Sequence, residues 1–218
     1  MTTIAVNRLH HPVTVLGHGV RAGIWVQGCS LGCHGCMSRD TWVERPESAV
    51  EVSEVVAWVL QLPGRLDGVT ISGGEPFEQP QALAALLGGL REATAGSDEP
   101  VDLLVYSGYA WSRLARTAAF RSALGHCDAV VAGPYVERRN TAVPLRGSDN
   151  QVVVPLTELG HERYGEQALE RYQQRRLQAS VVDGRLWLVG IPRREALRQW
   201  EQSLESAGVI WEGSSWNA

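Results

Sequence analysis

Lysine is absent from this chain of 218 residues, and all 20 of its basic residues are arginine. The absence excludes Schiff-base chemistry and lysine general bases, because both need a side-chain amine that can lose its proton. No apolar run approaches the roughly 20 residues that cross a bilayer. The net charge of -4 argues against a surface built for nucleic acid. We therefore expect a soluble cytoplasmic protein that binds neither membranes nor nucleic acid.

Cysteine is scarce, with 4 in the whole chain. The start from Met1 to His11 is polar and lacks a secretory apolar region, so a disulfide scaffold is not expected. Three of the four cysteines nevertheless stand close together, since Cys29, Cys33 and Cys36 are spaced CxxxCxxC. Reduced thiols in such a cluster agree with a cytoplasmic location.

The spacing supplies one thiolate too few for a four-coordinate metal site. Structural zinc sites and electron-transfer clusters normally have four protein ligands, whereas a site with an open position binds and reacts with something else. The loop therefore favours a cubane 4Fe-4S cluster with one iron left free, and Gly32 and Gly35 permit the backbone to wrap around it. Zinc with Cys127 as fourth ligand stays an alternative, although a second CxxC or HxxxH half is missing. We expect His34 to be exposed to solvent or to contact the metal ligands, but not to be a ligand itself. The other interpretation of Cys127 is a small buried apolar side chain.

Apolar, β-rich runs alternate with helical stretches along the chain. This alternation predicts an α/β fold with a parallel sheet and ligands at the carboxyl ends of its strands. We treat the chain as a single domain in which 133–150 is a long loop. Strands are predicted over 24–27, 68–72, 101–106, 129–132 and 151–155. Helices are predicted over 48–62, 79–93, 110–124 and 162–176. After these elements we predict a hairpin of strands 177–182 and 185–189, which turns at Asp183-Gly184, and a last helix over 193–207.

A second motif follows the strand predicted over 68–72, which ends in Gly73-Gly74-Glu75-Pro76. Two glycines let the backbone approach a ligand and expose its polar groups at the carboxyl edge of the sheet. Taken alone, the run fits a strand-to-helix turn in which the proline ends the strand. Its combination with CxxxCxxC is far more specific.

Together the two motifs resemble the radical S-adenosylmethionine superfamily, in which three cysteines hold a 4Fe-4S cluster and a GGE-type strand end contacts the methionine part of the cofactor. The runs Gly17-His18-Gly19-Val20-Arg21 and Trp25-Val26-Gln27-Gly28-Cys29 resemble the lead-in of glycyl radical enzyme activating proteins. The similarity covers about residues 12–155 and implies a partial (β/α) barrel, with 156–218 as a C-terminal appendage of hairpin and helix. Four further runs are similar to anaerobic ribonucleotide reductase activating proteins: Thr41-Trp42, Tyr106-Ser107-Gly108-Tyr109, Ala132-Gly133-Pro134-Tyr135 and Leu145-Arg146-Gly147-Ser148-Asp149-Asn150-Gln151.

The resemblance also implies a set of site residues. Ser107 would meet the ribose or adenine of the cofactor, or it is a turn serine. Asn150 would contact the cofactor or order its loop, and Arg21 would meet a carboxylate or pair on the surface. No catalytic side chain is assigned. The cluster ligands would be Cys29, Cys33 and Cys36, the methionine-facing edge would be Gly73, Gly74 and Glu75, and Gly35 and Met37 would line the same pocket.

The implied activity is reductive cleavage of S-adenosylmethionine to a 5′-deoxyadenosyl radical, which takes a hydrogen from a glycine Cα of a partner. That partner would be a glycyl radical enzyme, with anaerobic ribonucleotide reductase as the nearest class, and the electron would come from a donor such as flavodoxin or ferredoxin. One alternative is a radical enzyme of the same superfamily that modifies a peptide or a small metabolite. Another is a non-catalytic iron-sulfur or zinc binding module. Trp211 and Trp216 suggest that the C-terminal tail binds a partner.

Overall fold

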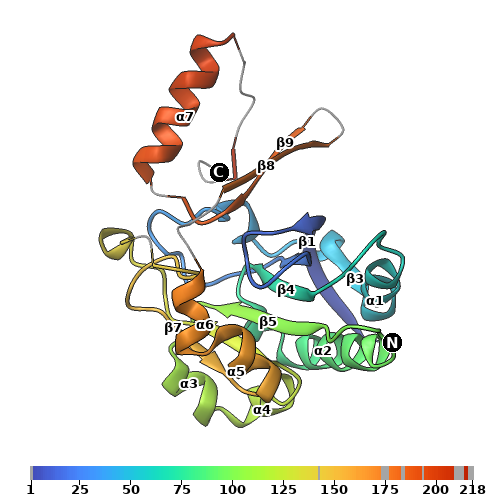
Figure 1. Cartoon of the computed structure of the whole chain (residues 1–218). Coiled ribbons are helices and arrows are strands. Elements are labelled where there is room, and N and C mark those ends of the chain that lie inside the picture. The colour runs from blue at the N-terminus through green and yellow to red at the C-terminus, as the bar shows by residue number, and fades with distance from the viewer. Residues whose placement is uncertain are drawn as a thin grey trace.

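The computed structural model describes residues 2–141, 143–172, 177–182, 185–192, 194–208 and 214–215. Its centre is a seven-stranded sheet in the order β3-β1-β2-β4-β5-β6-β7 (Figure 1). The four middle strands are parallel: β2 (Arg21–Val26), β4 (Gly68–Gly73), β5 (Asp102–Ser107) and β6 (Ala129–Ala132). The outer strands are antiparallel to their neighbours: β1 (Thr3–Val13), β3 (Ala49–Glu51) and β7 (Val152–Pro155).

Helices cover one face of this sheet. Alternate strand residues such as Val69, Ile71 and Leu103 point to that face and are fully buried. They pack against the apolar side of α2, where four leucines are also fully buried. The helices on this face of the sheet are α1 (Val52–Leu60), α2 (Pro80–Thr94), α3 (Trp111–Arg116) and α4 (Arg121–Leu124).

The opposite face is covered in two places. Near β6, Tyr164 of α5 (Glu158–Tyr164) packs on Leu104 and Val131, and α6 (Glu166–Arg171) follows. Near β1, the hairpin of β8 (Leu177–Val182) and β9 (Arg185–Gly190) contributes Val189 to a second cluster with Val13, Leu16 and Trp25. The last helix, α7 (Arg194–Ser206), stands beyond the hairpin in Figure 1. The expected α/β fold, with a mostly parallel sheet and a C-terminal hairpin and helix, is confirmed.

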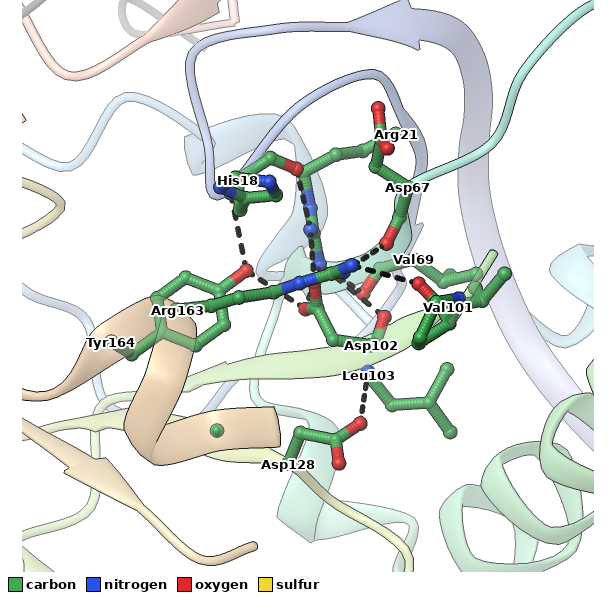
Figure 2. A network of polar contacts seen from close by, with 12 residues as sticks. His18, Arg21, Asp67, Val69, Val101, Asp102, Leu103, Asp128, Arg163 and Tyr164 are labelled. Atoms are coloured by element: carbon green, nitrogen blue, oxygen red, sulfur yellow. Dashed lines mark hydrogen bonds and ion pairs between the residues drawn. The ribbon is translucent and has the colours of Figure 1, made fainter. Parts of the chain in front are cut away.

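A buried ion network closes the amino ends of the strands (Figure 2). The Arg21 guanidinium is fully buried and donates to both carboxylate oxygens of Asp102, at 2.7 and 2.9 Å. Arg163 Nη1 and Tyr164 Oη of α5 donate to the same carboxylate, at 2.7 and 2.8 Å. Burial alone would raise the pKa of Asp102, but the charge and hydrogen bonds of Arg21, with those of Arg163 and Tyr164, hold it below its usual value. The network therefore ties α5 to the sheet.

Three features differ from the sequence-based expectation. The helix expected over 110–124 breaks at Thr117, whose backbone is extended, so that Phe120 reaches the core. The helix expected over 162–176 is two helices, because Gly165 is extended and a side chain there would strike the His161 carbonyl. Strands β1 and β3 were not expected. The Asp183-Gly184 turn lies outside the described residues.

Within the described part of the chain, no helix is both long and apolar enough to span a membrane.

Candidate cluster and cofactor site

The loops that follow the four parallel strands converge on one cavity of about 580 Å³. Cys29 lies three residues beyond the end of β2, and Gly74 directly follows β4. Ser107 is the last residue of β5, and Gly133 directly follows β6. All four line the cavity. The carboxyl edge of the sheet therefore gathers the two sequence motifs into one site, as parallel strand topology requires.

The cysteine loop forms part of the wall of this cavity. Cys29, Cys33 and Cys36 are free, half-buried and all part of the lining. Gly32 and Gly35 have φ angles of +57° and +76°, which are left-handed conformations that suit glycine. Burial raises the pKa of the Cys29 thiol to about 11 and raises that of Cys33 too. Metal binding must therefore displace protons from these thiols.

The donor set fits a cluster rather than a single metal ion. Among the described residues, no three His, Cys, Asp or Glu side chains are grouped closely enough to hold one ion. A cubane instead takes each thiolate on a different iron, and three thiols on one loop can supply three such ligands. Cys127 precedes β6 at the opposite edge of the sheet, is 1% exposed and has its Sγ 3.3 Å from the Ala123 carbonyl. That placement contradicts the alternative in which Cys127 completes a zinc site.

The turn after β4 packs directly on the backbone that leads into the cysteine loop. Gly74 N donates to the Val26 carbonyl at 2.8 Å, and Glu75 N donates to the Gly28 carbonyl at 2.9 Å. A Cβ on Gly73 would stand 2.5 Å from Val26 N, and one on Gly74 would strike the Gly28 carbonyl. The two glycines are thus needed for the close approach of neighbouring backbones, in addition to any approach to a ligand.

The substitution Gly74→Ala tests whether this close packing of two backbones is needed for stability and for binding of iron. We expect it to lower the free energy of unfolding by about 1 to 3 kcal/mol, because backbone must move to admit the methyl group. The iron bound after reconstitution should fall with it. Gly96→Ala is the control, since a Cβ there meets nothing within 4 Å and the backbone is not left-handed. Equal urea midpoints and iron contents for the wild type and Gly74→Ala would contradict this account.

Glu75 is a fully buried link between the ends of β4 and β5. Its Oε1 accepts from Phe77 N at 3.0 Å and from Ser107 Oγ at 2.8 Å, and its Oε2 accepts from Gly108 N at 2.7 Å. Burial raises the pKa of Glu75 to about 7, although these hydrogen bonds oppose the shift. Ser107 in turn accepts from Tyr109 N at 3.0 Å. Glu75 and Ser107 therefore position each other at the cavity wall.

The remaining expected site residues divide into two groups. Gly35 and Met37 line the cavity with the cysteines. Asn150 is not among the lining residues, and its Nδ2 donates to the Pro134 carbonyl at 2.8 Å, which orders the 133–150 loop. Arg21 lies at the other edge of the sheet and pairs with Asp102. His34 has an 83% exposed side chain, with Nδ1 2.7 Å from a carboxylate oxygen of Glu137.

Several lining residues were missed by sequence reasoning. Tyr135 lies on the 133–150 loop, and Gln151 directly follows that loop. The Gln151 side chain orders the loop, because its Nε2 donates to the Gly133 carbonyl and its Oε1 accepts from Gly147 N, both at 2.7 Å. Position after a strand end could have revealed Tyr135, which directly follows Gly133-Pro134. Residues 186–192 and 214–215 also line the cavity. No local signal marks them, because they reach the site only when the chain folds back over β1.

Comparison with known proteins agrees with this site. The chain belongs to the family described as "4Fe-4S single cluster domain", whose model matches residues 15–154. An anaerobic ribonucleoside-triphosphate reductase-activating protein of Pasteurella multocida (strain Pm70) is 25% identical over 154 residues, which are 68% of this chain and 96% of that protein. A pyruvate formate-lyase-activating enzyme of Staphylococcus aureus (strain USA300) is 40% identical over 84 residues, which are 36% of this chain and 34% of that enzyme.

Among solved structures, QueE from Escherichia coli matches with a TM-score of 0.41 and 18% identity, over 49% of this chain and 53% of that one. Residues 155–218, which include the hairpin, lie outside the family match.

Proposed function

We propose that this protein is a radical S-adenosylmethionine activating enzyme that generates a glycyl radical on a partner of the anaerobic ribonucleotide reductase class. The observation that supports it most is the meeting of the cysteine loop and the Gly73-Gly74-Glu75 edge in one cavity. The Pasteurella relative, matched over nearly its whole length, bears the name of such an activator. We further propose that the protein acts in the cytoplasm, where thiols stay reduced, with flavodoxin or ferredoxin as electron donor.

The protein's own residues have three tasks in this reaction. Cys29, Cys33 and Cys36 hold the cluster and leave one position without a protein ligand. A cluster bound there would supply one electron for the reductive cleavage of S-adenosylmethionine. The turn after β4 would present its backbone to the methionine part, and the hydrogen bond from Ser107 Oγ to Glu75 fixes the geometry of that turn. Gly35, Met37 and Tyr135 line the same cavity and would surround the bound cofactor.

The test is anaerobic reconstitution with iron and sulfide, reduction with dithionite, and assay of 5′-deoxyadenosine formation from S-adenosylmethionine. We expect cleavage, a cluster electron paramagnetic resonance signal that changes when S-adenosylmethionine is added, and a glycyl radical signal once the anaerobic reductase from the same organism is included. A cluster indifferent to S-adenosylmethionine would favour a non-catalytic binding module. Cleavage without a radical on any protein partner would favour a modifying enzyme of another substrate class.

A further inference from the structure

A single carboxylate, that of Glu78, fastens the start of the cysteine loop. Ser30, which directly follows Cys29, donates its backbone N–H to both Glu78 carboxylate oxygens, at 3.1 Å each. The Ser30 hydroxyl donates to Oε1 of the same carboxylate. Glu78 ends the short 3₁₀ helix Pro76–Glu78, which directly follows Glu75. The glycine motif therefore reaches the cysteine motif through this side chain as well as through the backbone.

The same carboxylate also reaches the end of β5. Tyr109, which lies two residues beyond that strand, donates its hydroxyl to Glu78 Oε1 at 3.2 Å. Leu31 of the cysteine loop packs on the same turn, since a Cβ on Gly108 would stand 2.3 Å from Leu31 Cδ1. Glu78 thus joins the cysteine loop to the ends of two parallel strands, so the protein itself positions the backbone next to Cys29.

The Glu78 carboxylate forms no ion pair with an arginine or histidine in the part of the chain that the structure describes. Arg113 stacks on the Tyr109 ring instead, with its guanidinium carbon 3.5 Å from the ring centroid. The hydrogen bonds that Glu78 accepts all come from uncharged donors, namely Ser30 and Tyr109. Its negative charge is therefore not neutralised, and it lies 3.1 Å from the nitrogen that is bonded to the Cys29 carbonyl carbon.

A negative charge at this place opposes the arrival of an electron. A 4Fe-4S cluster gains one negative charge on reduction, and its potential depends on the charges, hydrogen bonds and solvent around it. Resting on the proposed function, we propose that Glu78 is a positioning residue that holds the cysteine loop and, through its charge, lowers the reduction potential of the cluster. A lower potential favours transfer of that electron to S-adenosylmethionine, where it enters the carbon–sulfur bond that breaks.

The variant Glu78→Gln removes the charge but keeps an oxygen that can accept from Ser30. Full-length protein is reconstituted anaerobically with iron and sulfide and titrated with dithionite in the absence of S-adenosylmethionine, while electron paramagnetic resonance follows the reduced cluster. We expect nearly the wild-type iron content and a more positive midpoint potential. The ratio of reduced to oxidised cluster at a fixed potential should rise at least about threefold, which is about 30 mV for a one-electron couple.

Glu78→Asp separates the charge from the reach of the side chain. It keeps the carboxylate but is one methylene shorter, so it holds Ser30 less well. We expect it to bind less iron, at a midpoint potential closer to that of the wild type than to that of Glu78→Gln. Equal shifts in the two variants would mean that the hydrogen bonds set the potential, and would overturn the role of the charge. Glu78→Gln with the wild-type potential, or without most of its iron, would overturn it as well.

Glu92→Gln is the matched control, because it removes the same charge from an exposed position on α2 at the opposite edge of the sheet. The neighbouring Arg91 donates there to the Val101 carbonyl, just before β5. Glu92→Gln should keep the wild-type potential, and a shift like that of Glu78→Gln would contradict an effect of position. A shift in Glu78→Gln alone, with no cleavage of S-adenosylmethionine by the wild type, would remove the proposed function and leave the role of Glu78. A wild type without a reducible cluster would remove both.

Discussion

Cys33→Ala should bind little iron after reconstitution and should form 5′-deoxyadenosine at least about 100-fold more slowly than the wild type. The reason is the count of ligands. Only three thiols line the cavity, so none is in reserve, and two thiolates on a single loop cannot hold a cubane in one orientation. Iron and sulfide content, the visible absorption of the cluster and product formation would each report the loss.

Cys127→Ala is the matched control for that variant. Cys127 is buried in the helix-side core at the opposite edge of the sheet. Its replacement should leave the iron content unchanged and should cost stability alone, by about 1 kcal/mol for the small cavity created. Loss of iron in Cys127→Ala, or normal iron in Cys33→Ala, would show that the ligands have been assigned wrongly.

Asp102→Asn should be among the most destabilising substitutions in the protein. The Asp102 carboxylate is the shared counterion of two buried guanidinium groups, Arg21 and Arg163. An amide of the same shape leaves both cations facing each other without compensation. Removing one partner of a buried pair costs about 3 to 5 kcal/mol, a large fraction of the 5 to 15 kcal/mol that typically stabilises a domain. Urea unfolding followed by circular dichroism would measure the change.

Asp149→Asn provides the comparison for Asp102→Asn. Asp149 pairs with Arg139 at 2.5 Å, but their side chains are 36% and 51% exposed. Solvent screens such a pair, so the substitution should change the unfolding free energy by at most about 1 kcal/mol. Similar losses in the two variants would mean that burial of the Asp102 network does not set its contribution.

The sequence predicted best those parts of the molecule in which local pattern and burial agree. The four parallel strands are largely apolar, so their positions could be predicted from pattern, and the cysteine and glycine motifs follow two of them, β2 and β4. Strand β1 was missed because its residues are mixed in polarity and include Pro12. Its order comes from pairing with β2 on one side and β3 on the other.

The broken helices show a second limit. Both ends of α5 carried a signal in the sequence. Gly165 is a glycine that ends the helix, and Thr157 is a helix N-cap whose Oγ accepts from Gly160 N at 3.0 Å. At Thr117 no comparable signal exists, and the break follows from the fit of Phe120 against Phe77 in the core. The position of Arg21 was equally hidden, because its partner Asp102 lies 81 residues away.

The order of the elements along the chain affects how the site is assembled during synthesis. The cysteine loop leaves the ribosome long before β9, since about 150 residues separate Cys36 from Leu186. At roughly 5 to 20 residues per second, that gap lasts on the order of 10 to 30 seconds. During this interval the nascent chain carries all three cysteines of the loop, while strand β9, whose residues from Leu186 to Gly190 also line the cavity, has not yet been synthesised. The cysteine loop is therefore made well before Trp187 can pack onto His10.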